Sequence, residues 1–341
     1  MFLVEKSQLT SHFKSKFTKK PPSTTTKFYQ QQAASRSLYD EKIISHLKTL
    51  TPLPTSSFTL QWISNAVNFL TKVHTDSVTH ISSLKSVQSD YYHVLYMDYS
   101  LKVLDLCNLM TSAVQKLTER RMLMKLSLRL IDSSSSGEAP ASEKVKKAKD
   151  VLMRSVGVDL APEVEKAKRA KDLIGELIEL ISSGEIPAPE KVEKDHQSKT
   201  LIGKSEPLIR KDLIGRTLYG LGVLTVFVSN VLVSVLYGRL DIDIDTIDEI
   251  RVPAEFGWAD SVNDMFDQIN SKKGLLKEVK DVSDVIGDGS EERLINGGEE
   301  LKKVVGKFSD GVDELTNGVN GLFRCVMNTR NGVLDGVRKC V

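Results

Sequence analysis

The apolar positions in the first half of the chain recur at helical spacing. Across residues 60–84 they return in three- and four-residue steps and so line one face of a helix. The longer stretch Asp90–Ile131 is apolar around much of its circumference, which predicts a helix covered on several sides. Before both, LYDEKIISHLKTL at 38–50 predicts a short helix ended by Pro52 and Pro54. The pattern predicts an all-α fold, an elongated multi-helix bundle.

The C-terminal part repeats apolar residues in alternating steps of four and three, which is typical of a coiled-coil seam or of one helix in an antiparallel bundle. Four glycines interrupt the stretch, and each costs about 1 kcal/mol relative to Ala in an exposed helix. This helix is therefore expected to be stable only when packed, either against the helices at 58–84 and 90–131 or against a helix of a partner protein. The seam residues are Leu301, Val305, Phe308, Val312, Leu315, Val319, Leu322 and Val326.

One run of 22 residues, TLYGLGVLTVFVSNVLVSVLYG, contains no charged residue. As a helix it would be about 33 Å long, which matches a hydrocarbon core of about 30 Å. An arginine flanks each side and a tyrosine lies just inside each end, where interfacial aromatic residues are found. Asn230 near the middle opposes a lipid environment, because an unpaired amide is costly there. Two interpretations stay open, a membrane-inserted helix and the central helix of a soluble bundle. The candidate ends of the membrane helix are Arg216, Thr217, Tyr219, Tyr237, Gly238 and Arg239.

Two further segments have a distinct composition. Residues 1–37 carry seven Lys and Arg against one acid and are rich in Ser and Thr, which is typical of a disordered basic tail and also of a plastid transit peptide. SGEAPASEKVKK at residue 136 returns as SGEIPAPEKVEK at residue 183, which indicates a charged, partly duplicated helical insertion. We expect a tail at 1–37, an N-terminal helical segment at 38–132, the insertion or linker at 133–200, the apolar helix at 201–240, and a C-terminal segment at 241–341 that packs on the bundle.

The sequence contains no recognisable catalytic or metal-binding motif. With 47 basic and 45 acidic residues the net charge is +2, which gives no reason to expect nucleic acid as the partner. Three scattered cysteines do not form a zinc or disulfide pattern, and no phosphate loop, nucleophile elbow or paired histidine is present. DIDIDTIDEIRV resembles a calcium loop, but Thr246 and Val252 stand where glycine and glutamate are needed. We expect no cofactor, metal, catalytic residue or small-molecule substrate; an enzyme with a dispersed site is the alternative.

Three blocks in this order resemble the plant BYPASS family, which includes the ROH-type proteins. They are FTLQWISNAVNFLTKVHTDSVTHISSLK with YYHVLYMDYSLKVLDLCNLMTSAVQKL, then TVFVSNVLVSVL, then VPAEFGWADSVNDMFDQIN followed by the ELKKVV…VDELTNGVNGLFRCVMNTRN region. The resemblance covers roughly residues 38–132 and 200–340. The duplicated insertion and the glycine-rich C-terminal helix depart from the family pattern.

The resemblance implies a mainly helical plant protein without enzymatic activity that regulates development. Its founding branch restrains a root-derived mobile signal that arrests shoot growth. The ROH branch implies protein partners in the exocyst and a role in secretion. The family also implies membrane association through the apolar stretch, which we expect at the endoplasmic reticulum or secretory pathway, on the cytosolic face. The plastid is the alternative, because of the basic N-terminus.

Overall fold

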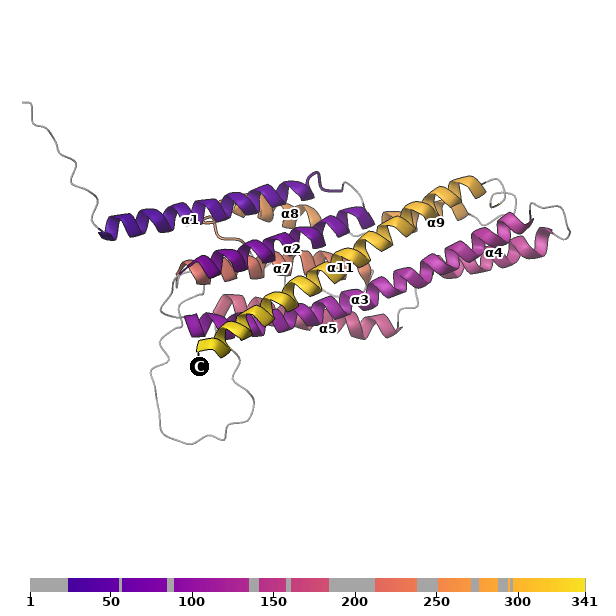
Figure 1. The fold of residues 1–341 in the computed structure, drawn as a ribbon. Coiled ribbons are helices and arrows are strands. Elements are labelled where there is room, and N and C mark those ends of the chain that lie inside the picture. The colour runs from indigo at the N-terminus through magenta and orange to yellow at the C-terminus, as the bar shows by residue number, and fades with distance from the viewer. Residues whose placement is uncertain are drawn as a thin grey trace, which may run out of the picture.

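The computed structural model describes residues 24–54, 57–84, 89–134, 141–157, 161–183, 212–237, 251–270, 276–287, 294 and 297–340. Every regular element in these ranges is helical, and the helices lie side by side in an elongated bundle (Figure 1), so the predicted all-α bundle is confirmed. The elements are α1 (Thr24–Leu47), η1 (Lys48–Leu50), α2 (Leu60–Ser83), α3 (Ser89–Ser134), α4 (Ala141–Val156), α5 (Ala161–Ser183), α7 (Leu213–Leu236), α8 (Ala259–Asn270), α9 (Lys277–Ile286) and α11 (Gly298–Cys340).

Helix α1 begins at Thr24, well before the boundary of 38 expected from the sequence. Part of the segment predicted as a tail is therefore helical, and residues 1–23 lie outside the described ranges. Long-range contacts hold this part of α1: Arg36 donates to the carbonyl of Glu255, and the hydroxyl of Ser35 lies 3.0 Å from Nε2 of His80. These partners are distant in sequence, so local composition did not indicate them.

Helices α2 and α3 each pack against both α7 and α11. Thr59 caps α2, because its hydroxyl accepts a hydrogen bond from the amide of Trp62 at 3.1 Å. Helix α3 has 46 residues, about 69 Å at 1.5 Å per residue, and runs the length of the molecule (Figure 1). Both helices lie close to the ranges predicted for them.

The described part of the segment at 133–200 consists of α4 and α5. Helix α4 packs on α3, and α5 packs on both α3 and α7. Leu152 of α4 and Leu177 of α5 are fully buried. Both helices therefore contribute side chains to the core of the bundle. The second copy of the duplicated phrase lies within residues 184–211 apart from its first residue, and this range is outside the description.

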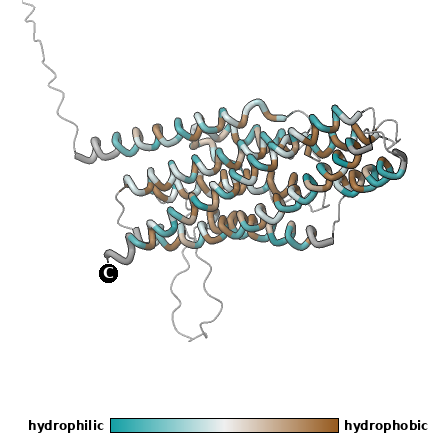
Figure 2. Tube along the Cα trace, turned by 45° about the vertical axis from the view of Figure 1, so that its right-hand side comes forward, coloured by the Kyte–Doolittle hydropathy of each residue, from teal (hydrophilic) through white to brown (hydrophobic). Residues whose placement is uncertain are grey.

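Helix α7 lies inside the bundle and packs against α2, α3 and α5. Nineteen of its 24 residues are buried. Figure 2 shows that the most hydrophobic positions of the helices gather toward the middle of the bundle, with hydrophilic positions outside. The acidic connector that begins at Asp241 lies in the range 238–250, which the structure does not describe.

Helix α11 crosses α2 and α3 on the face shown in Figure 1 and also contacts α9. At Gly311 the helix approaches α2 so closely that an added Cβ would lie 2.6 Å from Cβ of Leu60. Glycine is needed there because any side chain would collide with Leu60. The glycines that weaken this helix in isolation therefore include one that permits its packing.

Candidate functional site

The N-terminal end of α7 is fixed by polar contacts with other helices. Asp212 is the N-cap residue, and its Oδ1 accepts from the amide of Gly215 at 2.8 Å. The same oxygen accepts from the hydroxyl of Tyr92 on α3 at 2.6 Å. A carboxylate at a helix N-terminus is stabilised by the free amides there and by the helix dipole. The partly buried Asp212 side chain therefore links the start of α7 to α3.

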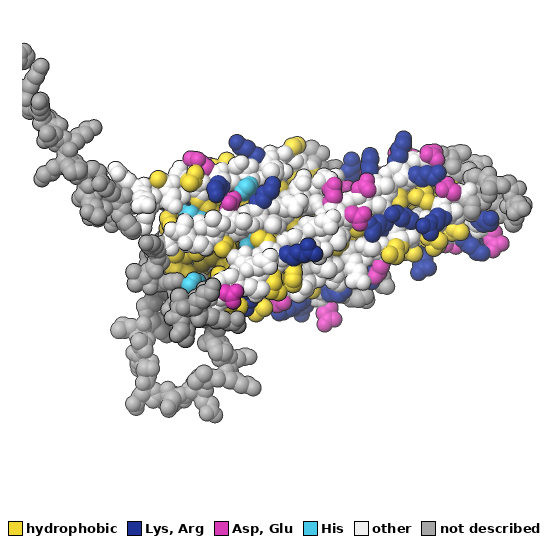
Figure 3. Space-filling model, in the orientation of Figure 1, with side chains coloured by type: hydrophobic (Ala, Val, Ile, Leu, Met, Phe, Trp, Pro, Cys, Tyr) yellow, Lys and Arg dark blue, Asp and Glu magenta, His cyan; other side chains and the backbone are white. Residues whose placement is uncertain are grey.

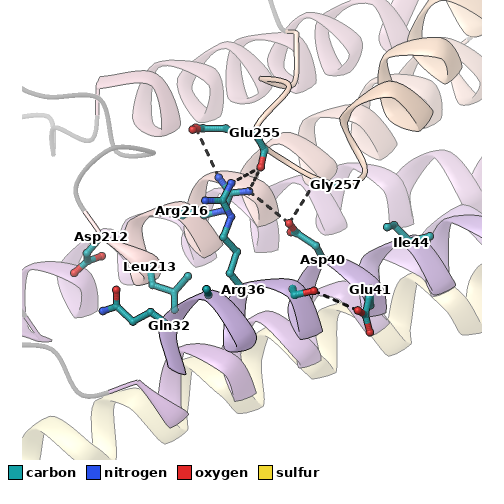
Figure 4. A pocket seen from close by; sticks show the side chains of 12 residues that line it. Gln32, Arg36, Asp40, Glu41, Ile44, Asp212, Leu213, Arg216, Glu255 and Gly257 are labelled. Carbon is teal, nitrogen blue, oxygen red and sulfur yellow. Dashed lines mark hydrogen bonds and ion pairs between the residues drawn. The ribbon is translucent and has the colours of Figure 1, made fainter. Parts of the chain in front are cut away.

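Arg216, expected at the edge of a membrane helix, points into a protein pocket instead (Figure 4). Its Nη2 donates to the carbonyl of Glu255 at 2.6 Å and lies 3.5 Å from Oδ2 of Asp40 on α1. Its guanidinium also lies 3.8 Å from the centre of the Phe256 ring, a cation–π arrangement. Burial and the nearby charge of Arg36 lower the pKa of Arg216, whereas Asp40 and Glu255 act in the opposite direction. Its side chain is only 8% exposed.

Asp40 is the carboxylate that completes this cluster. Its Oδ1 accepts from the indole nitrogen of Trp258 at 3.2 Å, and its Oδ2 accepts from the amide of Gly257 at 3.3 Å. Both of its oxygens therefore have donors in the loop before α8, in addition to Arg216. The cluster joins α1, α7 and this loop, three segments that are far apart in the sequence.

Thr217 and Tyr219 also contact protein. The Thr217 hydroxyl donates to the carbonyl of Leu213 at 2.8 Å, so it accepts from Nδ1 of His80, 3.0 Å away. This leaves Nε2 of His80 to accept from Ser35, consistent with a neutral ring whose pKa is lowered by burial and by the charge of Lys42. The ring of Tyr219 stacks on Phe256 with centroids 5.7 Å apart.

At the other end of α7, Tyr237 is buried and its hydroxyl donates to the carbonyl of Leu109 on α3 at 2.8 Å. Gly238 and Arg239 lie outside the described residues. Tyr219 and Tyr237, which the sequence pattern placed at the two membrane interfaces, therefore both contact other parts of the bundle. The pattern was compatible with both environments because a tyrosine hydroxyl needs a partner in either one.

The middle of α7 is adapted to close helix contacts. An added Cβ at Gly222 would lie 2.2 Å from Cγ2 of Ile181 on α5, and one at Gly220 would lie 3.2 Å from the Trp258 ring. The Thr225 hydroxyl donates to the carbonyl of Leu221 and accepts from Tyr99 of α3 at 2.7 Å. Among the described residues, α7 is the one helix long and apolar enough to cross a membrane by length and composition. In this structure 83% of its most apolar window is buried by protein.

The seam of α11 is covered by α2 and α3 of the same chain. All eight predicted seam residues are buried, and none is more than 2% exposed. Arg121 of α3 pairs with Asp313 beside the seam, and Thr75 of α2 lies 3.3 Å from the sulfur of Cys325. Helices α2 and α3 correspond to the predicted helices at 58–84 and 90–131. Packing of the seam against these two helices was one of the two alternatives given by the sequence, the other being a helix of a partner protein.

A cleft of about 710 Å³ opens between α1, the start of α7 and the loop before α8. Its charged lining comprises Arg36, Asp40, Glu41, Asp212, Arg216 and Glu255. Asp40, Asp212 and the two arginines are engaged in the structural contacts described above, whereas Glu41 is exposed and accepts from Ser37 at 3.3 Å. Within the part of the chain that the structure describes, no group of three His, Cys, Asp or Glu could hold a metal ion.

Sequence reasoning missed one buried titratable group, His74 of α2. Its side chain is inaccessible, its Nε2 lies 2.9 Å from the Tyr96 hydroxyl, and its ring stacks on Tyr99. Burial lowers the pKa of His74 to about 4, so the ring is neutral at physiological pH. The sequence contained one indication of this burial, because His74 lies on the apolar face of α2, between Val73 and Ser77.

Comparison with known proteins finds similarity to plant proteins. The chain is 26% identical over 260 residues to UPF0496 protein 4 of Oryza sativa subsp. japonica and 25% identical to its counterpart in subsp. indica, in both cases over 72% of this chain. It spans about half of those relatives, 51% of their length. It is also 24% identical over 320 residues to Protein BPS1, chloroplastic, of Arabidopsis thaliana, which covers 88% of this chain and 82% of that protein.

No family model and no solved structure matches the chain. The similarity to BPS1 confirms the resemblance to the plant BYPASS family that the three sequence blocks indicated. It supports the coarser functional expectation, a relationship to plant developmental regulators.

Proposed function

We propose that this protein is a non-enzymatic regulator of plant development of the BYPASS type. The observation that carries the proposal is the similarity to BPS1 over 88% of this chain and 82% of that protein. In its specific form, the proposal is that the protein restrains a root-derived mobile signal that arrests shoot growth.

The arrangement of polar groups supports a scaffold rather than a catalyst. Tyr39 donates to the Ser77 hydroxyl at 2.7 Å, because Ser77 itself donates to the carbonyl of Val73. Tyr99 and His80 donate to threonine hydroxyls of α7 in the same way. These side chains cross-link helices, and an active site would instead need polar groups that converge on space for a substrate.

Grafting tests the specific function. Rootstocks that lack the protein should arrest wild-type shoots grafted onto them, and expression of the protein in the root should restore growth. Normal shoot growth on deficient rootstocks would contradict the proposal. The rival, an enzyme that uses the cleft, is tested by expressing a variant with both Glu41→Gln and Glu255→Gln, which removes the two exposed carboxylates of the cleft lining and keeps their size. Full rescue supports a non-enzymatic role, and failed rescue by a stably folded variant supports the enzyme.

For membrane association we propose a peripheral mode in which α7 stays inside the bundle. Its removal into lipid would break the contacts of Arg216 with Asp40 and of Thr217 with His80. It would also expose the apolar faces of α2, α3 and α5 that now cover it. Alkaline carbonate should therefore release the protein from membranes, and a C-terminal tag should remain accessible to protease. A pelleted protein with a protected tag would contradict the peripheral mode.

The proposed location is the cytosolic face of the endoplasmic reticulum or secretory membranes. The alternative is the plastid, which the basic N-terminus of this chain and the chloroplastic designation of its relative BPS1 favour. A C-terminal fluorescent fusion leaves the N-terminus free, and plastid fluorescence would reject the secretory location. An exocyst subunit stays a proposed partner, and its contact surface would differ from the seam of α11, which α2 and α3 cover.

A further inference from the structure

The outer face of α3 exposes large apolar side chains next to basic ones. Met122 is 64% exposed and Leu126 is 45% exposed. Lys125 and Arg129 are also exposed. Positions 122, 125, 126 and 129 are separated by three, one and three residues, which places all four on one face of a helix. We call these four residues the outer face of α3. Isolated exposed hydrophobic residues are common, but two on adjacent turns flanked by cations form a local amphipathic surface.

The surroundings of this face are strongly basic. Residues 116–157 contain ten Lys and Arg against five Asp and Glu, a net charge of +5 in a chain whose total is +2. Helix α4 supplies half of these cations and packs alongside, with the Ser127 hydroxyl donating to the carbonyl of Ala148 at 2.7 Å. Figure 3 shows many Lys and Arg side chains over the half of the bundle where α3 meets α11 and α4, with Asp, Glu and hydrophobic side chains among them.

Part of this positive charge is neutralised within the protein. Lys116 pairs with Glu119, Arg121 with Asp313, and Lys147 with Glu143. Neither Lys125 nor Arg129 takes part in an ion pair with another residue of the described ranges. The two cations adjacent to Met122 and Leu126 are thus available to an external anion.

We propose that the outer face of α3 docks the protein on an anionic lipid surface. This inference rests on the proposed peripheral membrane association and specifies the surface that carries it. Phosphate or carboxylate headgroups would contact Lys125 and Arg129, while Met122 and Leu126 enter the boundary between headgroups and acyl chains. A nucleic acid would pair with the cations but would leave the methionine and leucine in water. The lipid surface satisfies both kinds of side chain.

This mode of docking leaves the core intact. Met122 and Leu126 already face solvent, so their insertion breaks no packing contact of the bundle. The other cations of 116–157 add attraction over a Debye length of about 8 Å at physiological ionic strength. Binding through this face is therefore expected to weaken as the salt concentration rises.

Vesicle flotation of the full-length protein tests the proposal. The probes are phosphatidylcholine vesicles with and without 30 mol% phosphatidylserine, an approximate content chosen to give a strongly negative surface. Wild type should float with the anionic vesicles and remain unbound with the neutral ones. Lys125→Gln with Arg129→Gln should lower the partition coefficient about twenty-five-fold, since each basic residue near the surface contributes about fivefold. Met122→Ser with Leu126→Ser should also lower it, by about tenfold.

The matched control is Lys48→Gln with Lys72→Gln, which removes two exposed cations from η1 and α2. It should change partitioning by less than about threefold. All variants alter exposed positions, so their helical circular dichroism and thermal midpoint should match wild type. If both outer-face variants float as the control does, the outer face of α3 is not the docking surface, and the proposed peripheral membrane association is retained. If wild type binds neither vesicle, both this inference and the proposed peripheral association fail.

Discussion

The Arg216 guanidinium and the Asp40 carboxylate lie 3.5 Å apart in the interior of the bundle, with side chains 8% and 12% exposed. Arg216 lies in the first turn of α7, the most apolar helix, and Asp40 lies on α1. Their pairing identifies the environment of α7, because a cation at the edge of a membrane would instead reach toward lipid headgroups or water. Removal of Arg216 leaves the Asp40 charge buried without its ion-pair partner, whereas Arg216 also has Glu255, whose Oε1 lies 3.7 Å from its Nη1.

Arg216→Gln should therefore lower the free energy of unfolding by about 3 kcal/mol, because Asp40 would keep its buried charge. Urea denaturation followed by circular dichroism measures the change. The control is Arg251→Gln, whose partner Asp267 lies 2.6 Å away but whose side chain is 52% exposed. It should cost less than about 1 kcal/mol. Equal losses in the two variants would show that the Arg216 pair is not buried in solution.

The apolar stripe of α11 could be read from the sequence because it depends on periodicity, whereas α7 begins at Leu213, four residues before the start of the uncharged run. The sequence alone did not show whether lipid or protein surrounds α7. That choice depends on Asp40, His80 and Leu109, which are distant in sequence and become neighbours only in the fold. The contacts of α1 with Glu255 and His80 were missed for the same reason, since the basic, Ser- and Thr-rich composition favoured disorder.

The seam itself gives the second prediction. Val312 and Leu315 are fully buried between α11 and its neighbours. Val312→Asp or Leu315→Asp places a carboxylate in this apolar environment, at a cost of several kcal/mol. Each variant should lose cooperative unfolding in urea, whereas Glu314→Gln on the exposed side should behave as wild type. A variant that stays folded and loses only a binding partner would indicate that the seam serves that partner.

Two glycines of α11 should respond in opposite directions to alanine. At Gly311 the new methyl would lie 2.6 Å from Cβ of Leu60, so Gly311→Ala should destabilise the protein by about 1–3 kcal/mol. At Gly306 no atom lies within 4 Å of the added carbon, so Gly306→Ala should stabilise it by about 0.5–1 kcal/mol through higher helix propensity. Thermal midpoints of the two variants measure both effects. A stabilising Gly311→Ala would contradict the close contact of α11 with α2.

The last prediction concerns acid. Burial lowers the pKa of His74 from its ordinary value of 6.5 to about 4, so the unfolded chain binds a proton before the folded protein does. The stabilisation that depends on a neutral His74 is fully present above pH 6.5 and is lost as the pH falls toward 4. Between pH 7 and pH 4.5 this residue should account for a loss of about 2.5 kcal/mol in the free energy of unfolding. His74→Gln keeps a polar side chain near Tyr96 and cannot titrate, so its loss over this range should be smaller than that of wild type by about this amount. Urea denaturation of both proteins at the two pH values provides the measurement. Equal losses in the free energy of unfolding would show that the pKa of His74 is not lowered in the folded protein.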